Sequence, residues 1–509
     1  MSERQRWTLV TVCVATFMLL LDITVVNVAL PSIRSSLHGS FTDLQWVVDA
    51  YSLTLATLLL TAGSLADQLG RRRVFVVGLG LFSAASLLCG LATTPLFLNL
   101  ARGAQGVGGA VMFATSLALL AQEFHGKERG VAFGIWGATI GGAVAIGPLV
   151  GGALTSAFGW EWIFFVNVPI GIAAMFAAMR FIHESRDPEG RGIDWLGLIT
   201  FSGSLFCLVF ALIRGNDEGW SSGMIVSLLV ASAVLMAAFL AVEMAQDRPM
   251  FDLSLFRKPA FVGASLAAFA LSASMFAMFL YLTLYLQGDL GYSPFQAGLR
   301  FLPISLISFF VAPVAGRLSA RIPLRTLLGA GLMLVGVGLL LMGGLSESSG
   351  WTHLIPGFII AGAGVGMANP SLATIAVGVV PPARSGMASG INNTFRQAGI
   401  ATGIAGLGAI FQHQVTSRFV DALAGTPMAG RSHALAHAVS SGAGSQAIDA
   451  LPPASRAVVA DAAQSAFVGG LNDILVVAAV VALVGAVLGA ALVRQQDFVV
   501  QPQTAAAAA

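Results

Sequence analysis

Long apolar runs follow one another along the whole chain, with short polar segments between them. Most runs reach about 20 residues, the length that an α-helix needs to cross the hydrocarbon core of a bilayer. The pattern therefore predicts an all-α membrane protein with fourteen membrane-spanning helices. We place these helices near residues 8–32, 45–66, 73–93, 96–122, 129–157, 162–182, 194–213, 221–243, 260–287, 295–319, 324–345, 353–379, 385–411 and 467–493.

Composition supports this class. Of the 509 residues, 56% are hydrophobic and only 10% are charged, whereas soluble domains carry about 25% charged residues. The net charge of +2 and the dispersed basic residues predict no nucleic-acid surface. The cysteines, Cys13, Cys89 and Cys207, lie in separate apolar runs and are expected to be buried side chains rather than disulfide or metal ligands.

The basic residues also orient the helices. Arg and Lys gather after the even-numbered runs, as at Arg71–Arg73 and at Lys127 and Arg129, and they are sparse after the odd-numbered ones. Under the positive-inside rule both termini of this multi-pass membrane protein are cytoplasmic. Residues 412–464 are expected to form a long outer loop, either with short helices of its own or poorly ordered, and 496–509 to form a disordered tail.

The chain repeats itself. Three short motifs of the first part, at Gly63, Gly106 and Gly130, recur in the same order at Gly316, Gly364 and Gly386, each after about 255 residues. This predicts two related halves of six helices each, 1–183 and 260–495. The segment 184–259 between them would be a linker with two inserted membrane helices.

Asp22 is the most unusual residue of the apolar runs, because a carboxylate near mid-membrane costs about 2.5–3.5 kcal/mol. Such an acid ordinarily marks a proton or ion site, and a static acid neutralised by a neighbouring helix is the alternative. Asp22 is expected about 12 Å below the outer end of the first helix, and Arg102 about 10 Å below that of the fourth. The two charges should therefore share a depth, as a proton relay or as a structural ion pair.

Other residues are candidates for binding or movement. Asp49 is either a second protonation site or an acid favoured by the start of a helix. The segment GSLADQLGRRR reads as a cytoplasmic hinge or, more simply, as a topology signal. Its candidate residues are Gly63, Asp67, Gly70, Arg71, Arg72 and Arg73.

The fifth and ninth helices have their own patterns. GPLVGG, with Gly147, Pro148, Gly151 and Gly152, suits close helix packing and a bend. Met and aromatic residues of the ninth helix either face lipid or core, or form an adaptable binding surface. The candidate substrate-binding residues are Met275, Phe279 and, beside Arg102, Gln105.

Five segments together resemble the fourteen-span drug:proton antiporters of the major facilitator superfamily. They are LDITVVNVALP, GSLADQLGRRR, LARGAQGVGG, GPLVGG and GWEWIFFVNVPIG, between Leu21 and Gly171. The resemblance implies proton coupling by Asp22 and Arg102, an inner-gate latch at GSLADQLGRRR, and export rather than import at GPLVGG. One departure is Glu161, which stands where the family usually has Arg, so an outer ion pair there is in doubt.

Together with this resemblance, the sequence predicts a proton-coupled multidrug or antibiotic efflux antiporter of a bacterial plasma membrane. The motifs leave the identity of its substrate open. Its partners would be protons, a small amphipathic organic substrate and the lipid bilayer, in a monomer without cofactor. No nucleotide-binding loop, metal spacing or nucleophile–base set is visible, so an enzyme is not expected. The alternatives are a dedicated exporter of one self-made metabolite and a non-transporting membrane sensor.

Overall fold

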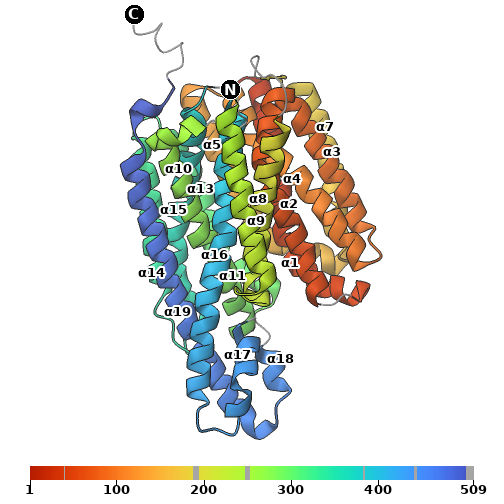
Figure 1. Cartoon of the computed structure of the whole chain (residues 1–509), viewed down its shortest axis with the longest axis vertical. Coiled ribbons are helices and arrows are strands. Elements are labelled where there is room, and N and C mark those ends of the chain that lie inside the picture. Colours follow the sequence, from red (N-terminus) through yellow and green to blue (C-terminus); the bar gives the residue numbers. More distant parts are fainter. Residues whose placement is uncertain (39–40, 187–193, 247–252, 382–383, 441–443, 500–509) are drawn as a thin grey trace, which may run out of the picture.

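The computed structural model describes residues 1–38, 41–186, 194–246, 253–381, 384–440 and 444–499, and within these ranges the regular structure is entirely helical. Most helices run the length of one elongated bundle (Figure 1). The principal ones are α1 (Glu3–Leu37), α2 (Phe41–Leu69), α3 (Arg71–Gly90), α4 (Pro95–Glu123), α5 (Gly126–Phe158), α6 (Trp162–Phe165), α7 (Asn167–Phe181), α8 (Trp195–Glu218), α9 (Gly223–Ala245), α10 (Pro259–Leu271), α11 (Ala277–Leu284), α12 (Pro294–Arg300), α13 (Leu302–Leu318), α14 (Leu324–Met342), α15 (Ile355–Gly378), α16 (Ser385–Ala422), α17 (Ser432–Ser440), α18 (Gly444–Asp449) and α19 (Pro453–Leu492).

Each of the fourteen predicted spans coincides with a helix or with consecutive helices. Among the described residues, eleven helices are long and apolar enough to cross a membrane. The other three predicted spans correspond to α5, to α12 with α13, and to α16. The sixth span is α6 followed by α7, and the ninth contains α10, α11 and two π-helical stretches, Ser272–Phe276 and Tyr285–Asp289.

The helices form two packed halves with α8 and α9 between them. In the first half α4 packs against α2 and α3, and α1 packs against α5; in the second, α14 packs against α15 and α19. The inserted pair α8 and α9 lies across the front of the bundle, where α8 contacts both α2 and α16 (Figure 1). The N-terminus and the C-terminal end of α19 lie at one end of the bundle, which we call the terminal end; α17 and α18 lie at the opposite, far end.

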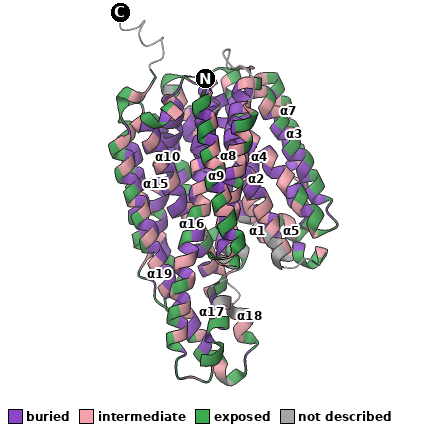
Figure 2. Ribbon diagram, in the orientation of Figure 1, coloured by how far each residue is buried: buried purple, intermediate pink, exposed green. Residues whose placement is uncertain are grey.

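Burial separates central from peripheral helices (Figure 2). In the most apolar 18 residues of α4, 83% of the residues are buried, whereas only 17% are buried in the corresponding stretch of α9. Large apolar side chains such as Phe176, Val230 and Phe310 are more than half exposed. An apolar exterior of this kind is what a helix bundle presents to lipid, so α9 is a lipid-facing helix and α4 a central one.

Two segments are more ordered than a simple loop or tail. Residues 412–464, expected as an outer loop that could hold short helices, do contain helices: α16 continues to Ala422, α17 and α18 follow, and α19 begins at Pro453. The segment is rich in alanine, the best helix former. In the predicted tail, Asp497 accepts a hydrogen bond from the Ala260 N–H at 2.9 Å. The Val499 N–H donates to the Gly378 carbonyl at 3.0 Å, so 496–499 are docked; 500–509 lie outside the described residues.

The halves meet closely through glycines near the terminal end. A Cβ atom at Gly63 of α2 would lie 2.5 Å from the carbonyl oxygen of Gly386 on α16. A Cβ atom at Gly130 of α5 would lie 2.3 Å from that of Gly316 on α13. These four glycines belong to two of the three repeated motifs, and each of these two motifs in one half touches the other motif in the opposite half, whereas Gly106 and Gly364 pack within their own halves. The internal repeat is therefore a pseudo-symmetric pair of helix crossings.

Candidate functional site: a buried ion pair and its polar shell

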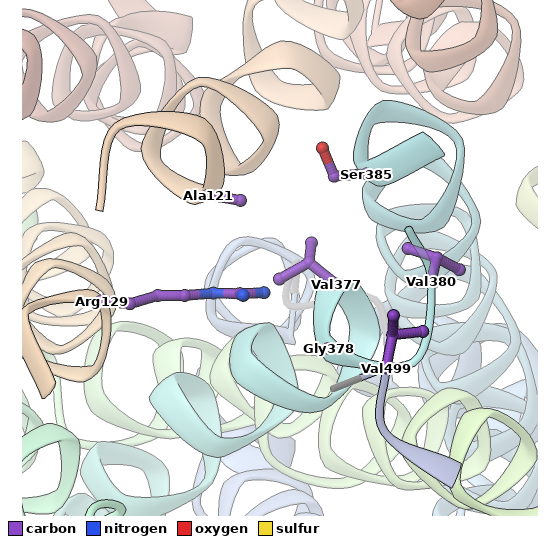
Figure 3. A pocket seen from close by; sticks show the side chains of 7 residues that line it. All are labelled: Ala121, Arg129, Val377, Gly378, Val380, Ser385 and Val499. Carbon is purple, nitrogen blue, oxygen red and sulfur yellow. The ribbon is translucent and has the colours of Figure 1, made fainter. Parts of the chain in front are cut away.

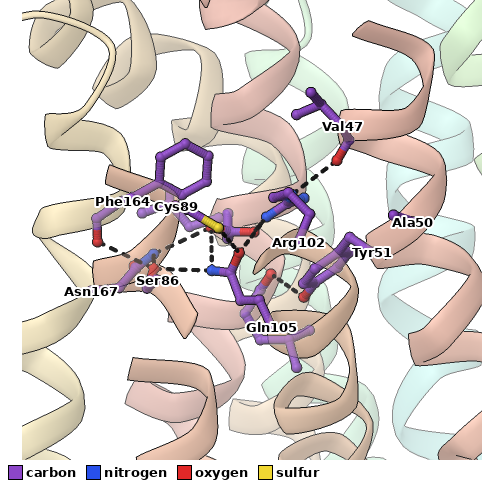
Figure 4. Close-up of polar contacts among 12 residues, drawn as sticks. Val47, Ala50, Tyr51, Ser86, Cys89, Arg102, Gln105, Phe164 and Asn167 are labelled. Carbon is purple, nitrogen blue, oxygen red and sulfur yellow. Dashed lines mark hydrogen bonds and ion pairs between the residues drawn. The ribbon is translucent and has the colours of Figure 1, made fainter. Parts of the chain in front are cut away.

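Asp22 of α1 and Arg102 of α4 form an ion pair inside the first half. The Arg102 Nη1 donates to Asp22 Oδ2, and the two residues are only 2% and 1% exposed. Removing two charges from water is costly unless they are paired and their remaining hydrogen-bonding groups are satisfied. The surrounding residues meet that condition (Figure 4).

Amide side chains complete the shell around the carboxylate. Gln105 accepts from Arg102 Nη1 at 2.7 Å and donates to Asp22 Oδ1 at 2.9 Å. Asn167 of α7 also donates to Asp22 Oδ1, at 3.2 Å. Both amides donate to the Ser86 hydroxyl of α3 at 3.0 Å. The Asp22 carboxylate thus accepts hydrogen bonds from three side chains, and four helices of one half meet at it.

The guanidinium of Arg102 is held from other directions as well. Its Nε donates to the Val47 carbonyl of α2 at 2.9 Å. The Tyr51 ring lies under the guanidinium carbon, 4.2 Å away, and the Phe164 ring lies 5.7 Å away. Cation–π contacts of this kind strengthen when they are desolvated. Arg102 therefore links α4 to both α1 and α2.

Glycines of α5 allow α1 to approach beside this site. A Cβ atom at Gly147 would overlap the Thr24 hydroxyl, and one at Gly151 would lie 3.0 Å from the Val25 side chain. Gly152 faces Phe295 of α12 instead, at an ordinary 3.9 Å. Pro148 lies within the same helix. The GPLVGG segment therefore fixes α1 against α5 just beyond Asp22.

A second polar site lies at the terminal end, where α2 meets α16. Asp67 forms an ion pair with Arg71 at 2.7 Å and accepts hydrogen bonds from the N–H groups of Gly386 and Met387 at 3.1 and 2.8 Å. Those N–H groups belong to the first turn of α16, where a helix leaves donors unpaired and favours negative charge. A residue of one half thereby caps a helix of the other.

The remaining arginines of this segment turn toward a different acid. Glu184 accepts from the N–H groups of Arg72 and Arg73 at 3.1 and 3.2 Å, and so caps the start of α3. Gly70, with φ +111°, makes the turn that precedes α3. A residue with a Cβ would be strained in this conformation and would also clash with Glu184.

A small cavity lies between α4, α5, α15 and α16 near the same end, and Arg129 points into it (Figure 3). Its volume open to the centres of water molecules is about 20 Å³, enough for about one water and too small for an organic molecule. The Arg129 Nε and Nη2 atoms are buried without a hydrogen-bond partner among the described residues. The two halves are therefore closely packed here, with a polar gap at their contact.

Comparison with known proteins assigns the family. A family model described as Major Facilitator Superfamily matches residues 12–404. The chain belongs to the major facilitator superfamily. The matched range begins in α1 and ends in α16, so it includes parts of both halves and the inserted helices. This confirms the predicted fold and its organisation as a multi-pass membrane protein.

Several curated members of the superfamily are similar over most of the chain. Multidrug resistance protein Stp of Mycobacterium tuberculosis (strain H37Rv) is 38% identical over 411 residues, 81% of this chain and 76% of that protein. Puromycin resistance protein pur8 of Streptomyces alboniger is 37% identical, over 80% of this chain and 82% of its own. The tetracenomycin C resistance and export protein of Streptomyces glaucescens is 32% identical, over 94% and 90%.

Solved structures show the same fold at low sequence identity. The human organic anion transporter MFSD10 has a TM-score of 0.64 at 14% identity, covering 96% of this chain and all of that one. The proton:xylose symporter XylE has a TM-score of 0.65 at 12% identity, covering 97% and 96%. The major facilitator fold therefore accommodates α8 and α9 without loss of its two-half arrangement.

The structure places the other predicted residues as follows. Asp49 lies within α2 and is half-buried. Gln105 is fully buried in the ion-pair shell, and Met275 is also fully buried. Phe279 is half-buried, with its ring 5.3 Å from that of Phe301. The substrate-binding role of these last residues stays a prediction.

Sequence reasoning missed several polar residues of this superfamily member. Asn167 and Ser86 complete the Asp22 shell, and Glu184 caps α3, yet short polar residues in apolar runs carry no distinctive spacing. Arg396 has a clearer sequence signal, because a cation within a predicted span ordinarily indicates a functional site. In the structure Arg396 is only 8% exposed.

Proposed function

We propose that the protein is a proton-coupled antiporter that exports small amphipathic organic compounds, such as antibiotics, across a bacterial plasma membrane. Relatives more than 30% identical over most of the chain are named for drug resistance or export, which supports export of such compounds here. The observation that carries the coupling is the buried ion pair of Asp22 and Arg102 with its closed shell of amides.

The pair offers a physical route from proton to movement. Protonation of Asp22 would remove the charge that Arg102, Gln105 and Asn167 surround. Arg102 would then be a buried cation without an ionic partner, which is strongly unfavourable. Since Arg102 also holds α2 through Val47 and Tyr51, relief of this cost would require α1, α2 and α4 to rearrange. Proton uptake would in this way shift the balance between two conformations.

We assign the terminal end to the cytoplasm, because Arg71–Arg73 lie there and cytoplasmic loops carry the excess of basic residues. The Asp67 cap on α16 and the glycine crossings then form a closed inner gate, the arrangement of an outward-facing state. Substrate would leave on the far side when Asp22 takes up a proton. The proton would be lost, and new substrate bound, once the inner gate opens.

The proposal makes the protein a transporter rather than an enzyme, active as a monomer and without a cofactor or nucleic-acid partner. The driving force is the proton gradient. Entry of one proton is worth about 1.4 kcal/mol per pH unit and about 2.3 kcal/mol per 100 mV of membrane potential. The proton gradient alone can therefore maintain an outward concentration gradient of an uncharged substrate.

A second candidate is a dedicated exporter of one metabolite made by the same cell. The observation in its favour is a relative named for a single compound, the tetracenomycin C resistance and export protein, whose alignment covers 94% of this chain. A resistance profile in a pump-deficient host distinguishes the two, since protection against several unrelated compounds would exclude a dedicated exporter.

Everted membrane vesicles test the function. We expect drug uptake into them to collapse on addition of a protonophore and to persist without ATP while respiration maintains the gradient. Uptake that requires ATP and resists the protonophore would contradict the proposal. A membrane sensor would produce no gradient-dependent flux at all.

A further inference from the structure

Arg396 of α16 is a cation at membrane depth without an ionic partner among the described residues. It lies eleven residues beyond the start of α16, about 17 Å along the helix axis and close to the middle of a 30 Å hydrocarbon core. Its contacts are a hydrogen bond from Nη1 to Asn369 Oδ1 at 3.0 Å and the Phe276 ring at 5.7 Å. A buried charge that is not neutralised by a partner is rare and costly.

The sequence offers no acid to neutralise it. Between Asp289 and Asp421 the only acidic residue is Glu347, in the connection between α14 and α15. In the first half, Asp22 is already paired with Arg102, and Asp67 with Arg71. The described part of the protein therefore supplies no negative group that neutralises the charge of Arg396.

Polar atoms without partners gather on the same helix. The hydroxyl of Ser389, the Nδ2 of Asn392 and both polar side-chain atoms of Asn393 are buried and make no hydrogen bond to the described part of the chain. With Arg396 they occupy positions i, i+3, i+4 and i+7, which lie on one face of an α-helix. Buried polar groups are nearly always paired, so a cluster of exceptions requires water, an ion, a bound molecule or strain to account for it.

Two neighbouring elements extend this set. The hydroxyl of Ser272, in the first π-helical stretch of the ninth span, is also buried and has no hydrogen-bond partner within the described ranges. Its Cβ would lie 3.1 Å from a Cβ atom at Gly399, so it packs against α16 one turn beyond Arg396. Asn369 brings α15 to the same place. Three elements of the second half, α15, α16 and this π-helical stretch, thus place polar groups that lack hydrogen-bond partners and one aromatic ring near the guanidinium of Arg396.

We propose that Arg396, with Asn369, Asn393 and Phe276, forms a substrate subsite for an amphipathic organic anion that carries a carboxylate or phenolate group. The guanidinium fork matches a planar anionic group. The amides would bind polar substituents and the Phe276 ring would face the apolar part. The inference rests on the proposed export function and specifies its substrate class; the proton site of the first half is separate from this subsite.

Transport of two probes tests this proposal. Proteoliposomes with an imposed proton gradient are given carboxyfluorescein, an organic anion, or ethidium, an organic cation. We expect Arg396→Gln to reduce carboxyfluorescein transport about tenfold or more, the value of a lost charge-assisted hydrogen bond, and to leave ethidium transport within about twofold. Arg396→Lys should retain part of the anion transport. The matched control is Arg418→Gln on the same helix, an exposed residue paired with Asp473, which should change neither.

The possible failures differ from one another. Equal loss of both probes in Arg396→Gln and Arg396→Lys would show a structural role and overturn the subsite. Gradient-driven transport of ethidium but not of carboxyfluorescein by the unaltered protein would overturn the substrate class while the export function stands. Gradient-driven transport of neither probe, nor of any drug, would overturn the function itself.

Binding measurements separate an organic substrate from a simple anion. Carboxyfluorescein should raise the unfolding temperature of the detergent-purified protein, and Arg396→Gln should lose this shift. Replacing gluconate by chloride in the buffer should cause no shift that depends on Arg396. If chloride alone produced the whole Arg396-dependent shift, the subsite would be an inorganic anion site and the proposal would be wrong.

Discussion

Asp67 of α2 accepts a hydrogen bond from the backbone N–H of Met387, 2.8 Å away at the first turn of α16 and 320 residues further along the chain. The same carboxylate pairs with Arg71, so one side chain joins the two halves and also its own helix end. The contact depends on a negative charge at a helix N-terminus, which is worth about 0.3–2 kcal/mol. It is therefore strong enough to bias a conformational balance without locking it.

Asp67→Asn should open the terminal end. The amide keeps the size of the side chain but loses the charge that binds Arg71 and the start of α16. We expect the population with an open inner gate to rise by about two- to thirtyfold, measured by labelling of single cysteines placed at either end. Glu128→Gln, an exposed acid of α5 at the same end, is the control. Unchanged labelling in both variants would contradict the latch.

Gly63→Ala should act on the same balance by a steric route. The added methyl group would lie 2.5 Å from the Gly386 carbonyl oxygen, so the closed crossing could form only with a shift of backbone. We expect labelling to favour the open inner gate and export to fall several-fold. Gly406→Ala on α16, where the methyl group meets nothing within 4 Å, should behave as the unaltered protein.

Asp22→Asn should separate binding from coupling. The amide can still accept a hydrogen bond from Arg102 but cannot titrate at physiological pH. We expect drug binding in detergent to remain measurable and gradient-driven export to be lost. Asp473→Asn, at a surface ion pair, should export normally. Full drug resistance from Asp22→Asn at equal expression would show that another residue carries the proton.

Arg102→Ala should destabilise the protein more than loss of a surface arginine does. It leaves Asp22 buried without its cation, at a cost of about 3–5 kcal/mol, whereas Arg418→Ala breaks an exposed pair worth about 0–1 kcal/mol. Thermal unfolding in detergent gives the comparison. The double variant Asp22→Asn with Arg102→Ala should recover part of the loss, because no buried charge remains. Equal unfolding temperatures for Arg102→Ala and Arg418→Ala would mean that the ion pair of Asp22 and Arg102 is open to solvent.

Arg102→Lys tests the geometry of the same site. Lysine keeps the charge but loses the planar fork with which Arg102 reaches Asp22, Gln105 and the Val47 carbonyl together. We expect the pH dependence of export to shift and its maximum to fall, in between the unaltered protein and Arg102→Ala. A pH profile identical to that of the unaltered protein would limit the role of Arg102 to its charge.

The number and order of helices could be predicted from the sequence, because each span is a long apolar run and lipid requires helices to satisfy their own backbone. Asp22 and Arg102 were also predictable as a pair, since rise per residue fixes depth and both charges are costly where they lie. The internal repeat predicted two halves, but not that Gly63 meets Gly386 and Gly130 meets Gly316. That pairing depends on how the halves dock, which no local pattern contains.

The polar shell around Asp22 could not be predicted from the sequence for a similar reason. Asn167 and Ser86 reach Asp22 only because α3 and α7 pack beside α1 and α4. For 412–464 the sequence left open whether the outer loop holds short helices, because weak hydrophobicity removes the signal of a membrane span while an alanine-rich segment can still be helical. The docked residues 496–499 depend on single contacts, at Ala260 and Gly378, that have no counterpart in composition.

The glycine crossings have a consequence for how such a chain can evolve. At Gly63 and Gly386, and at Gly130 and Gly316, backbone lies directly on backbone, so the gate is built from atoms that every residue shares. Substitutions elsewhere that alter size, charge or polarity leave these crossings untouched. The surfaces that meet an exported compound can thus diversify under selection by new toxins without any change at the backbone crossings on which opening and closing depend.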